Sequence, residues 1–407
     1  MRRRNRLKFK SNRSSRNIKK IAIRISSALL CVAVGFFTAM ITLPLFENKL
    51  PEQNGSSEAP SSLPESSVVS SEPEVEIIFD KGIRAVYIPP SALDTNEEQN
   101  SYHSLLRNSG INAVIFDIKD ESGVLYYPSQ IEMVTKVGNV SDISVNYRHT
   151  VKKFKDAGFY VIGRMVCFKD NTMPRNKVNY RPYSVLTDSR VNWYYNNIFW
   201  LDPYKETARD YLYSIVSESL ELGFNEIMLD EVKFPDSGPT YMLDYGEQAL
   251  SRSEILTEFI NRCAELAHGK NAKLSLKTSW KFVEGTATEE SGQNFSLGEL
   301  DIDCYLPDFR ITEVARSNKS MVIGEQTVAT PYKNPVSLIS ALDTLLNKKA
   351  VDGIVFRPYI SASSPAGYTY SSDEIKGQAL VFGGNDEYNF VYFEKSGSYS
   401  PDITETK

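Results

Sequence analysis

Cysteine and histidine are scarce in this chain of 407 residues, which contains four of the first and three of the second. No Cys-x-x-Cys pair occurs, and the three cysteines beyond the N-terminal region, Cys167, Cys263 and Cys304, are odd in number and far apart. We expect these three to be buried free thiols, because each falls in an apolar segment. No two histidines have helical or strand spacing, so the sequence predicts no zinc site, no other metal and no cofactor.

Acidic residues are absent before Glu47, whereas 11 Lys and Arg residues lie within residues 1–24. The net charge of -5 therefore conceals an acidic body, which argues against nucleic acid as a partner. Residues 25–46 form an uncharged, largely apolar run of about bilayer-spanning length, and no small-x-small cleavage site of a signal peptide follows Met40. We expect a single-pass signal-anchor helix in the cell membrane, in contact with the lipid bilayer. The basic arm, residues 1–24, would be cytoplasmic and the body extracytoplasmic.

Residues 47–76 are rich in Ser, Glu and Pro and have few large apolar side chains. This composition is typical of a disordered linker, with a reach on the order of 30 Å.

From residue 77 to residue 370, apolar runs of strand length alternate with helical patterns. The runs are almost continuous, which is typical of parallel strands buried on both faces. Strands are expected at residues 84–88, 111–118, 159–168, the run ending at Asp230, 272–278, 302–306, 321–323 and 353–358. This pattern predicts an α/β fold, a (β/α)8 TIM barrel. In the tail, residues 371–407, the segments 379–382 and 388–393 read as a β-hairpin around a Gly-Gly-Asn-Asp turn.

The most informative stretch runs from Gly223 to Pro235, where a short apolar run ends in Asp230 and Glu231. Carboxylates buried at the end of a strand cost several kcal/mol of folding free energy unless they are paired with cations or serve a function. Alternation places Asp230 on the face opposite Leu229, at the barrel mouth, which favours a functional role.

The ends of the other predicted strands carry more polar and aromatic side chains, and in a barrel these ends share one rim. They are Asp117, Lys119, Asp120, Arg164, Lys169, Asp170, Lys233, Lys277, Trp280, Asp303, Tyr305, Asp308, Glu325, Arg357 and Tyr359. Paired carboxylates suit glycoside chemistry, in which one protonates the leaving oxygen and the other attacks or activates water. Aromatic rings that could stack on sugars are Trp193, Tyr194, Tyr195, Trp200 and Trp280. The competing interpretation makes the charged groups structural ion pairs and the rings core residues.

Several motifs in order give the chain a resemblance to a known family. They are Gly110-Ile-Asn-Ala-Val-Ile-Phe-Asp-Ile-Lys-Asp120, Phe159-Tyr-Val-Ile-Gly-Arg-Met-Val-Cys-Phe-Lys-Asp170, Trp200-Leu-Asp-Pro203, the segment from Gly223 through Asp230 to Pro235, and Arg357-Pro358. They resemble a glycoside hydrolase-type domain of bacterial membrane-anchored or secreted proteins, assigned to the glycosidase TIM barrels, over residues 82–359. The resemblance implies that Asp230 is the catalytic candidate and that Asp117, Lys119 and Asp120 belong to the site.

This chain departs from the family pattern at two places. Glu231 stands where the family has an aromatic residue, and Cys304-Tyr-Leu-Pro-Asp308 replaces Met-x-Tyr-Pro-Ser. We expect a membrane-anchored glycoside hydrolase acting on a polysaccharide, with Asp230 as nucleophile or base and an acid drawn from Asp117, Asp303 or Asp308.

Two other arrangements stay open. One uses Glu231 as acid/base and Glu325 as nucleophile, and the other is an inactive polysaccharide-binding barrel. The expected substrate-binding residues are Lys119, Asp120, Arg164, Lys233, Trp200, Trp280, Tyr305, Arg357 and Tyr359. The sequence does not indicate an oligomeric state.

Overall fold

The computed structural model describes residues 82–107, 110–175, 184–187, 189, 191–384 and 387–399. The predicted cytoplasmic arm, signal-anchor helix and linker lie outside these residues. Among the helices that are described, none combines the length and the apolar character needed to span a bilayer.

The described residues form a closed parallel barrel in which nine strands occupy eight positions. The strands are β1 (Arg84–Ile88), β2 (Ala113–Lys119), β3 (Tyr160–Val166), β7 (Glu226–Asp230), β9 (Lys273–Ser279), β10 (Cys304–Asp308), β13 (Val355–Phe356), β14 (Tyr359–Ser361) and β17 (Phe390–Phe393). Both β13 and β14 pair with β10, so they form one strand position interrupted at Arg357 and Pro358. β17 pairs with β14 on one side and with β1 on the other, which closes the barrel. The predicted (β/α)8 architecture is therefore confirmed.

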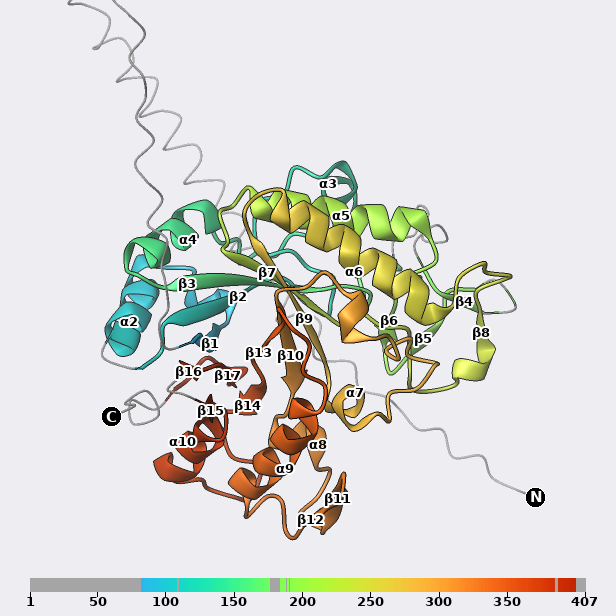
Figure 1. The fold of residues 1–407 in the computed structure, drawn as a ribbon. Coiled ribbons are helices and arrows are strands. Elements are labelled where there is room, and N and C mark those ends of the chain that lie inside the picture. The colour runs from blue at the N-terminus through green and yellow to red at the C-terminus, as the bar shows by residue number, and fades with distance from the viewer. Residues whose placement is uncertain are drawn as a thin grey trace, which may run out of the picture. The chain divides into compact units, whose positions relative to one another are not determined.

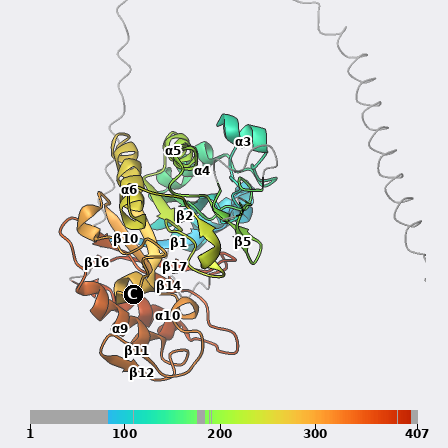
Figure 2. The ribbon, with the colours of Figure 1, turned by 90° about the vertical axis from the view of Figure 1, so that its right-hand side faces the viewer.

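Helices cover the outside of the barrel (Figure 1). They are α2 (Asn96–Arg107), α3 (Glu132–Val137), α4 (Tyr147–Asp156), α5 (Glu206–Leu220), α6 (Arg252–His268), α7 (Trp280–Glu284), α8 (Ile311–Val314), α9 (Pro335–Asn347) and α10 (Ser372–Leu380). Figures 1 and 2 place α4, α5 and α6 on one side of the barrel and α9 and α10 on the opposite side. The predicted capping box of α6 is confirmed, because Ser251 and Glu254 each accept a hydrogen bond from the other's backbone N–H.

The remaining short strands and 3-10 helices lie in the loops of the barrel. They are η2 (Pro90–Ala92), β4 (Leu186–Thr187), β5 (Tyr194–Tyr195), β6 (Ile198–Phe199), η3 (Thr240–Met242), β8 (Leu243–Asp244), η4 (Leu297–Glu299), β11 (Met321–Ile323), β12 (Gln326–Val328), β15 (Gly383–Gly384) and β16 (Glu387–Tyr388).

Two predicted strand assignments are wrong. Met321–Ile323 forms β11, which pairs only with β12 in a separate antiparallel sheet and takes no part in the barrel. The tail hairpin is confirmed only at its turn, where Gly383–Gly384 pairs antiparallel with Glu387–Tyr388. Its predicted arms are wrong, because residues 379 and 380 end α10, and Phe390–Phe393 is the closing barrel strand β17. The barrel therefore extends beyond the boundary predicted at residue 370.

Side chains inside the barrel lie at successive levels, which β7 illustrates. Glu226 at its start is paired with Arg357, and Met228 accepts a hydrogen bond from the Tyr359 hydroxyl at its Sδ. Asp230 ends the strand at the mouth. Ile227 and Leu229 alternate with these residues and pack in the outer core instead. A charged pair and an apolar level thus lie beneath the mouth of the barrel. The three described cysteines are buried and free, as predicted.

Candidate active site

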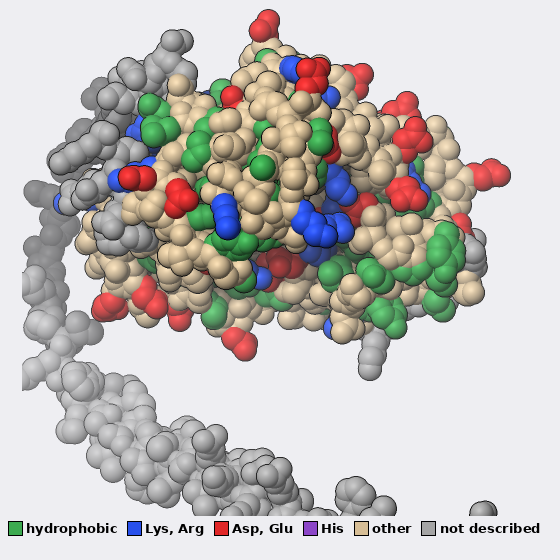
Figure 3. Space-filling model, turned by 90° about the horizontal axis from the view of Figure 1, so that it is seen from below, with side chains coloured by type: hydrophobic (Ala, Val, Ile, Leu, Met, Phe, Trp, Pro, Cys, Tyr) green, Lys and Arg blue, Asp and Glu red, His purple; other side chains and the backbone are tan. Residues whose placement is uncertain are grey.

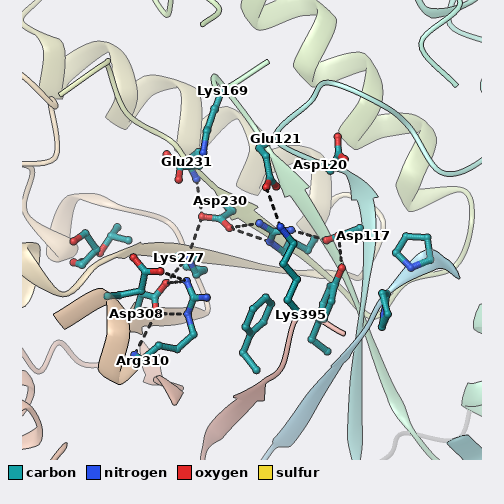
Figure 4. Close-up of a pocket in the computed structure, with 18 of the residues that line it drawn as sticks. Asp117, Asp120, Glu121, Lys169, Asp230, Glu231, Lys277, Asp308, Arg310 and Lys395 are labelled. Atoms are coloured by element: carbon teal, nitrogen blue, oxygen red, sulfur yellow. Dashed lines mark hydrogen bonds and ion pairs between the residues drawn. The ribbon is translucent and has the colours of Figure 1, made fainter. Parts of the chain in front are cut away.

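A cavity of about 720 Å³ opens where the barrel strands end. It lies at the carboxyl ends of the strands, the face that carries the chemistry in TIM-barrel enzymes. Its charged lining is Asp117, Asp120, Glu121, Arg164, Lys169, Asp230, Glu231, Lys233, Lys277, Asp308, Arg310, Glu313 and Lys395. Figure 4 shows Asp117, Asp230, Lys277 and Asp308 converging from β2, β7, β9 and β10, with other charged groups around them.

Arg164, from the middle of β3, joins two buried carboxylates at the floor of this cavity. Its Nη1 lies 2.7 Å from Asp117 Oδ1, and its Nε and Nη2 lie 2.9 and 2.8 Å from Asp230 Oδ2. The Tyr87 hydroxyl donates to the other oxygen of Asp117 at 2.6 Å. Because both carboxylates contact one guanidinium, their facing oxygens are at most about 8 Å apart, which is no further than the two carboxyl groups of glycosidases can be.

Lys277, from β9, links Asp230 to a third carboxylate. Its Nζ lies 3.3 Å from Asp230 Oδ1 and 3.0 Å from Asp308 Oδ2. Arg310 binds Asp308 through both carboxylate oxygens, with Nε 2.8 Å and Nη2 2.6 Å away. Cations and carboxylates thus alternate across the floor of the cavity (Figure 4).

These contacts separate the pKa values of the three acids. Burial would raise the pKa of Asp230, but Lys277 and then Arg164 outweigh it and hold that pKa well below its usual range. Lys277 and Arg310 likewise lower the pKa of Asp308 to about 2. Burial prevails at Asp117 and raises its pKa in spite of Arg164. The floor therefore holds two ionised carboxylates and one acid that retains its proton more readily.

Glu231 takes a left-handed backbone conformation immediately after β7, with φ of 52°. Such a conformation costs a residue with a side chain about 1–2 kcal/mol. It lets the backbone N–H of Glu231 donate to Asp230 Oδ1 at 2.8 Å. The Glu231 side chain lies in the cavity wall, 3.6 Å from Lys233 Nζ, and Lys233 also pairs with Asp236.

Several residues predicted for the site lie elsewhere. Lys119 is fully buried, pairs with Asp170 at 2.9 Å and donates to the Val166 carbonyl, because the register of β2 shifts between residues 117 and 119. Arg357 is paired with Glu226 inside the barrel beneath the cavity. These placements correct the expectation that Lys119 and Arg357 contact substrate.

Two carboxylates that were predicted to be catalytic also lie away from the cavity. Asp303 precedes β10, at the end of the barrel away from the cavity, where it bonds His268 and the backbone N–H of Leu274. Glu325 is exposed in the turn between β11 and β12. The arrangement with Glu325 as nucleophile is therefore wrong, and Asp303 is no longer a candidate acid.

The expected aromatic platforms do not line the cavity. Trp200 and Trp193 are buried in the core, and Tyr305 and Tyr359 are buried among the barrel strands. Trp280 begins α7 outside the cavity lining. The rings in the lining are instead those of Tyr87, Tyr126 and Phe393.

Asp120 does reach the cavity, but its carboxylate is already used by its own loop. It accepts hydrogen bonds from the backbone N–H groups of Ser122 and Val124 and from the Tyr126 hydroxyl.

The sequence did not predict four residues of the cavity lining, namely Tyr87, Arg310, Phe393 and Lys395. Tyr87 could have been found, because it lies at the carboxyl end of the first predicted strand. Within the described ranges, no group of three or more His, Cys, Asp or Glu side chains is placed to hold a metal ion.

The barrel and its sequence are similar to known glycoside hydrolase domains. The PgaB (BpsB) glycoside hydrolase domain from Bordetella bronchiseptica has 14% identity, with 78% of this chain and 94% of that chain covered and a TM-score of 0.56. A hypothetical protein from Ruminiclostridium thermocellum ATCC 27405 has 31% identity over 47% of this chain and 96% of that chain, with a TM-score of 0.43. Ega3 from Aspergillus fumigatus, solved in complex with galactosamine, has 12% identity, covers 78% and 93% of the two chains, and gives a TM-score of 0.40. A search of curated proteins finds no match.

At 14% identity, the similarity to the Bordetella domain supports the fold alone. A family model described as "Putative glycosyl hydrolase domain" matches residues 85–399, which is well over half of the chain. The resemblance expected from the motifs around Asp117, Arg164 and Asp230 is thereby confirmed. The chain belongs to this glycosyl hydrolase domain family.

Proposed function

We propose that this chain is a glycoside hydrolase that cleaves glycosidic bonds of a cell-surface or extracellular polysaccharide. The observation that carries the proposal is the pair of buried carboxylates, Asp230 and Asp117, held on one guanidinium at the floor of the cavity. Glycoside hydrolysis needs two carboxyl groups in opposite protonation states on the two sides of the scissile bond.

Asp230 acts as the nucleophile, or as the base that activates a water molecule. Lys277 and Arg164 lower its pKa, so it is ionised at neutral pH. The backbone N–H of Glu231 at Oδ1 and the two nitrogens of Arg164 at Oδ2 fix the orientation of the carboxylate. A fixed orientation favours attack at a single position of the bound sugar.

Asp117 acts as the general acid. Its raised pKa keeps a larger share of the carboxyl group protonated near neutral pH than an exposed aspartate would have. When the proton passes to the leaving oxygen, Arg164 and Tyr87 are in place to stabilise the carboxylate that forms. Asp308 stays ionised and adds negative charge near the developing oxocarbenium ion.

The anchoring of the enzyme is part of the proposal. Residues 25–46 span the cell membrane, residues 1–24 stay in the cytoplasm, and the linker holds the barrel outside the membrane. This assignment rests on the apolar run and on the 11 cations that precede it.

Reducing-end release from a panel of cell-wall and capsular glycans tests the catalytic assignment. We expect Asp230→Asn to abolish turnover and Asp117→Asn to lower kcat by about 100- to 10,000-fold, with the circular dichroism spectrum unchanged. Asp303→Asn is the matched control, since it removes a carboxylate at the other end of the barrel. Full activity of Asp117→Asn together with inactivity of Glu231→Gln would transfer the acid role to Glu231.

A second function is favoured by one observation. Both oxygens of Asp230 are occupied, one by Arg164 and the other by Lys277 and a backbone N–H, as in a purely structural carboxylate. In that case the barrel binds polysaccharide without cleaving it. Glycan retention in a pull-down with no released reducing ends would identify such a binder, and release that disappears with Asp230→Asn excludes it.

A further inference from the structure

Exposed large apolar side chains are concentrated at one place on the described surface. Eight side chains of this kind are exposed, and five of them fall in residues 191–195 and 241–242. These five, here called the tyrosine patch, are Val191, Tyr194, Tyr195, Tyr241 and Met242. Tyr241 is 85% exposed and Tyr194 is 57% exposed. A cluster of exposed apolar side chains is unfavourable in water, and such clusters usually form a binding surface.

Backbone pairing brings the two segments of the patch together. Leu243 and Asp244 of β8 pair with Thr187 and Leu186 of β4, and the N–H of Thr187 bonds the carbonyl of Val191. The ring of Tyr195 lies against Gly238, where an added Cβ would come within 2.4 Å of the ring. A small sheet and a hairpin therefore hold the two segments of the patch next to each other.

The patch borders the cavity. The segment that carries Tyr241 leaves the cavity wall at Lys233, which pairs with Asp236 at 3.1 Å shortly before Gly238. The hairpin that carries Tyr194 and Tyr195 returns to the cavity wall through Trp200, whose backbone bridges to that of Lys169. In Figure 3, charged side chains gather in a central hollow. A hydrophobic area lies beside it on the right, where Figure 1 places β5, β6 and β8.

We propose that the tyrosine patch is an accessory binding surface for the polysaccharide chain where it leaves the cavity. This inference rests on the proposed glycoside hydrolase function. A cavity of about 720 Å³ has the size of a pocket for one small ligand, so a polymer must extend across its rim. Tyrosine suits this task, because its ring covers the apolar face of a sugar and its hydroxyl bonds the sugar's hydroxyl groups. The cavity itself is lined mainly by charged groups and offers few such rings.

Carboxylates on the segment that carries Tyr241 favour a glycan over an anionic membrane surface on that side of the patch, although Asp236 is paired with Lys233. On the other side, the cation of Arg175 lies over the ring of Phe199, which stacks with Tyr194. Asp236, Asp244 and Glu247 lie on the same segment as Tyr241. Carboxylates repel anionic headgroups, whereas segments that lie on such membranes carry Lys and Arg on their polar face.

Affinity electrophoresis tests the proposal on the full chain in detergent, with Asp230→Asn present so that the polymer stays intact. The native gels contain dextran, galactomannan, glycol chitosan or alginate. We expect at least one polymer to retard the chain, and we expect Tyr194→Ala with Tyr241→Ala to weaken that retardation about tenfold or more. Tyr241→Trp should preserve it. Leu380→Ala is the matched control, because Leu380 is 61% exposed and lies outside the patch.

The active chain without Asp230→Asn supplies the second readout. The tyrosine substitutions should raise KM for the long polymer and leave kcat unchanged for the shortest oligosaccharide that is cleaved. Equal retardation of the variants, or no retardation by any of the four polymers, overturns the proposal. So does a lower oligomeric mass of the variants, which would assign the patch to a second copy.

Tryptophan fluorescence distinguishes lipid binding from polysaccharide binding. A blue shift in the emission of the Tyr241→Trp variant with phosphatidylglycerol vesicles, absent from the parent chain and absent with every polymer, would assign the patch to lipid and overturn the proposal. Turnover that survives Asp230→Asn would refute the catalytic proposal, while the gels would still decide the role of the patch.

Discussion

Replacing Arg164 with methionine should destabilise the protein more than most single substitutions do. The guanidinium contacts Asp117 and Asp230, and each of these side chains is almost entirely buried. Methionine fills a similar volume but leaves two carboxylates close together with one cation fewer. Breaking a buried ion pair by removing one partner costs about 3–5 kcal/mol. We expect a loss of this size in the free energy of unfolding at pH 7.5.

The loss should depend on pH with a definite sign. Removing the cation raises the folded-state pKa of both carboxyl groups relative to the wild type. The pH dependence between 4.5 and 7.5 comes from Asp117, because burial already holds its folded-state pKa above the ordinary value, and such an acid costs stability at pH values above its unfolded-state pKa of about 4. The variant should therefore be closest to the wild type near pH 4.5 and furthest from it near pH 7.5. Each proton taken up on folding changes the difference by about 1.4 kcal/mol per pH unit. In the wild type, the lowered pKa of Asp230 contributes stability above about pH 4 that is lost as the pH falls further.

Urea unfolding of the full chain in detergent, followed by the fluorescence of Trp193, Trp200 and Trp280, measures the effect at both pH values. Adding Asp117→Asn and Asp230→Asn to Arg164→Met should recover part of the lost stability, because the uncompensated charges are gone. Arg310→Met is a milder comparison, since Lys277 still pairs with Asp308. A variant as stable as the wild type at pH 7.5, or a loss that grows as the pH falls to 4.5, would refute this reasoning.

Three further substitutions probe the supports of the site. Gly123→Ala should lower Tm markedly, because Gly123 has φ of +83° and an added Cβ would lie 2.1 Å from Asp170 Oδ1. Gly138→Ala, with a similar φ but nothing within 4 Å, should lower it less, and equal shifts in the two would contradict the clash. Lys119→Met should cost about 3–5 kcal/mol in urea unfolding by leaving Asp170 unpaired, with kcat per folded molecule unchanged; a lower kcat would restore Lys119 to the substrate site. Glu231→Gly should relieve the left-handed strain, offset in part by glycine's extra chain entropy, and unfolding measurements that show a large loss would mean that the Glu231 side chain contributes stability.

Much of the barrel could be predicted because its strands are buried on both faces and leave almost continuous apolar runs. Seven of the expected runs are barrel strands. The remaining expected run, Met321–Ile323, is an apolar segment of the right length, but it pairs with Gln326–Val328 across a local turn. The true closing strand, Phe390–Phe393, follows a Gly-Gly-Asn-Asp sequence that is typical of a hairpin turn. Its pairing with β1 is a contact across the whole domain, which local patterns do not reveal.

The candidate site was predictable to the extent that side-chain direction follows from alternation. Asp117, Asp230 and Asp308 were expected at strand ends, and all three line the cavity. Lys119 was misplaced because the register of β2 shifts after Asp117, which cannot be read from residue types. Asp303 was misplaced because it starts its strand instead of ending it.

The closing strand has a consequence for how the enzyme is made. The backbone N–H of Ile83 bonds the side chain of Asn389, 306 residues later, beside the junction of β1 and β17. Ribosomes add about 5–20 residues per second, so β1 waits on the order of 15–60 s before its partner is synthesised. Until β17 is synthesised, the edge of β1 that will pair with it is the open edge of a growing parallel sheet, a state prone to aggregation. Phe393 and Lys395 also complete the cavity wall, so a nascent chain gains its proposed activity only once β17 has been added. An enzyme built in this way stays inactive until β17 has been synthesised, and the edge of β1 stays open to other chains until then.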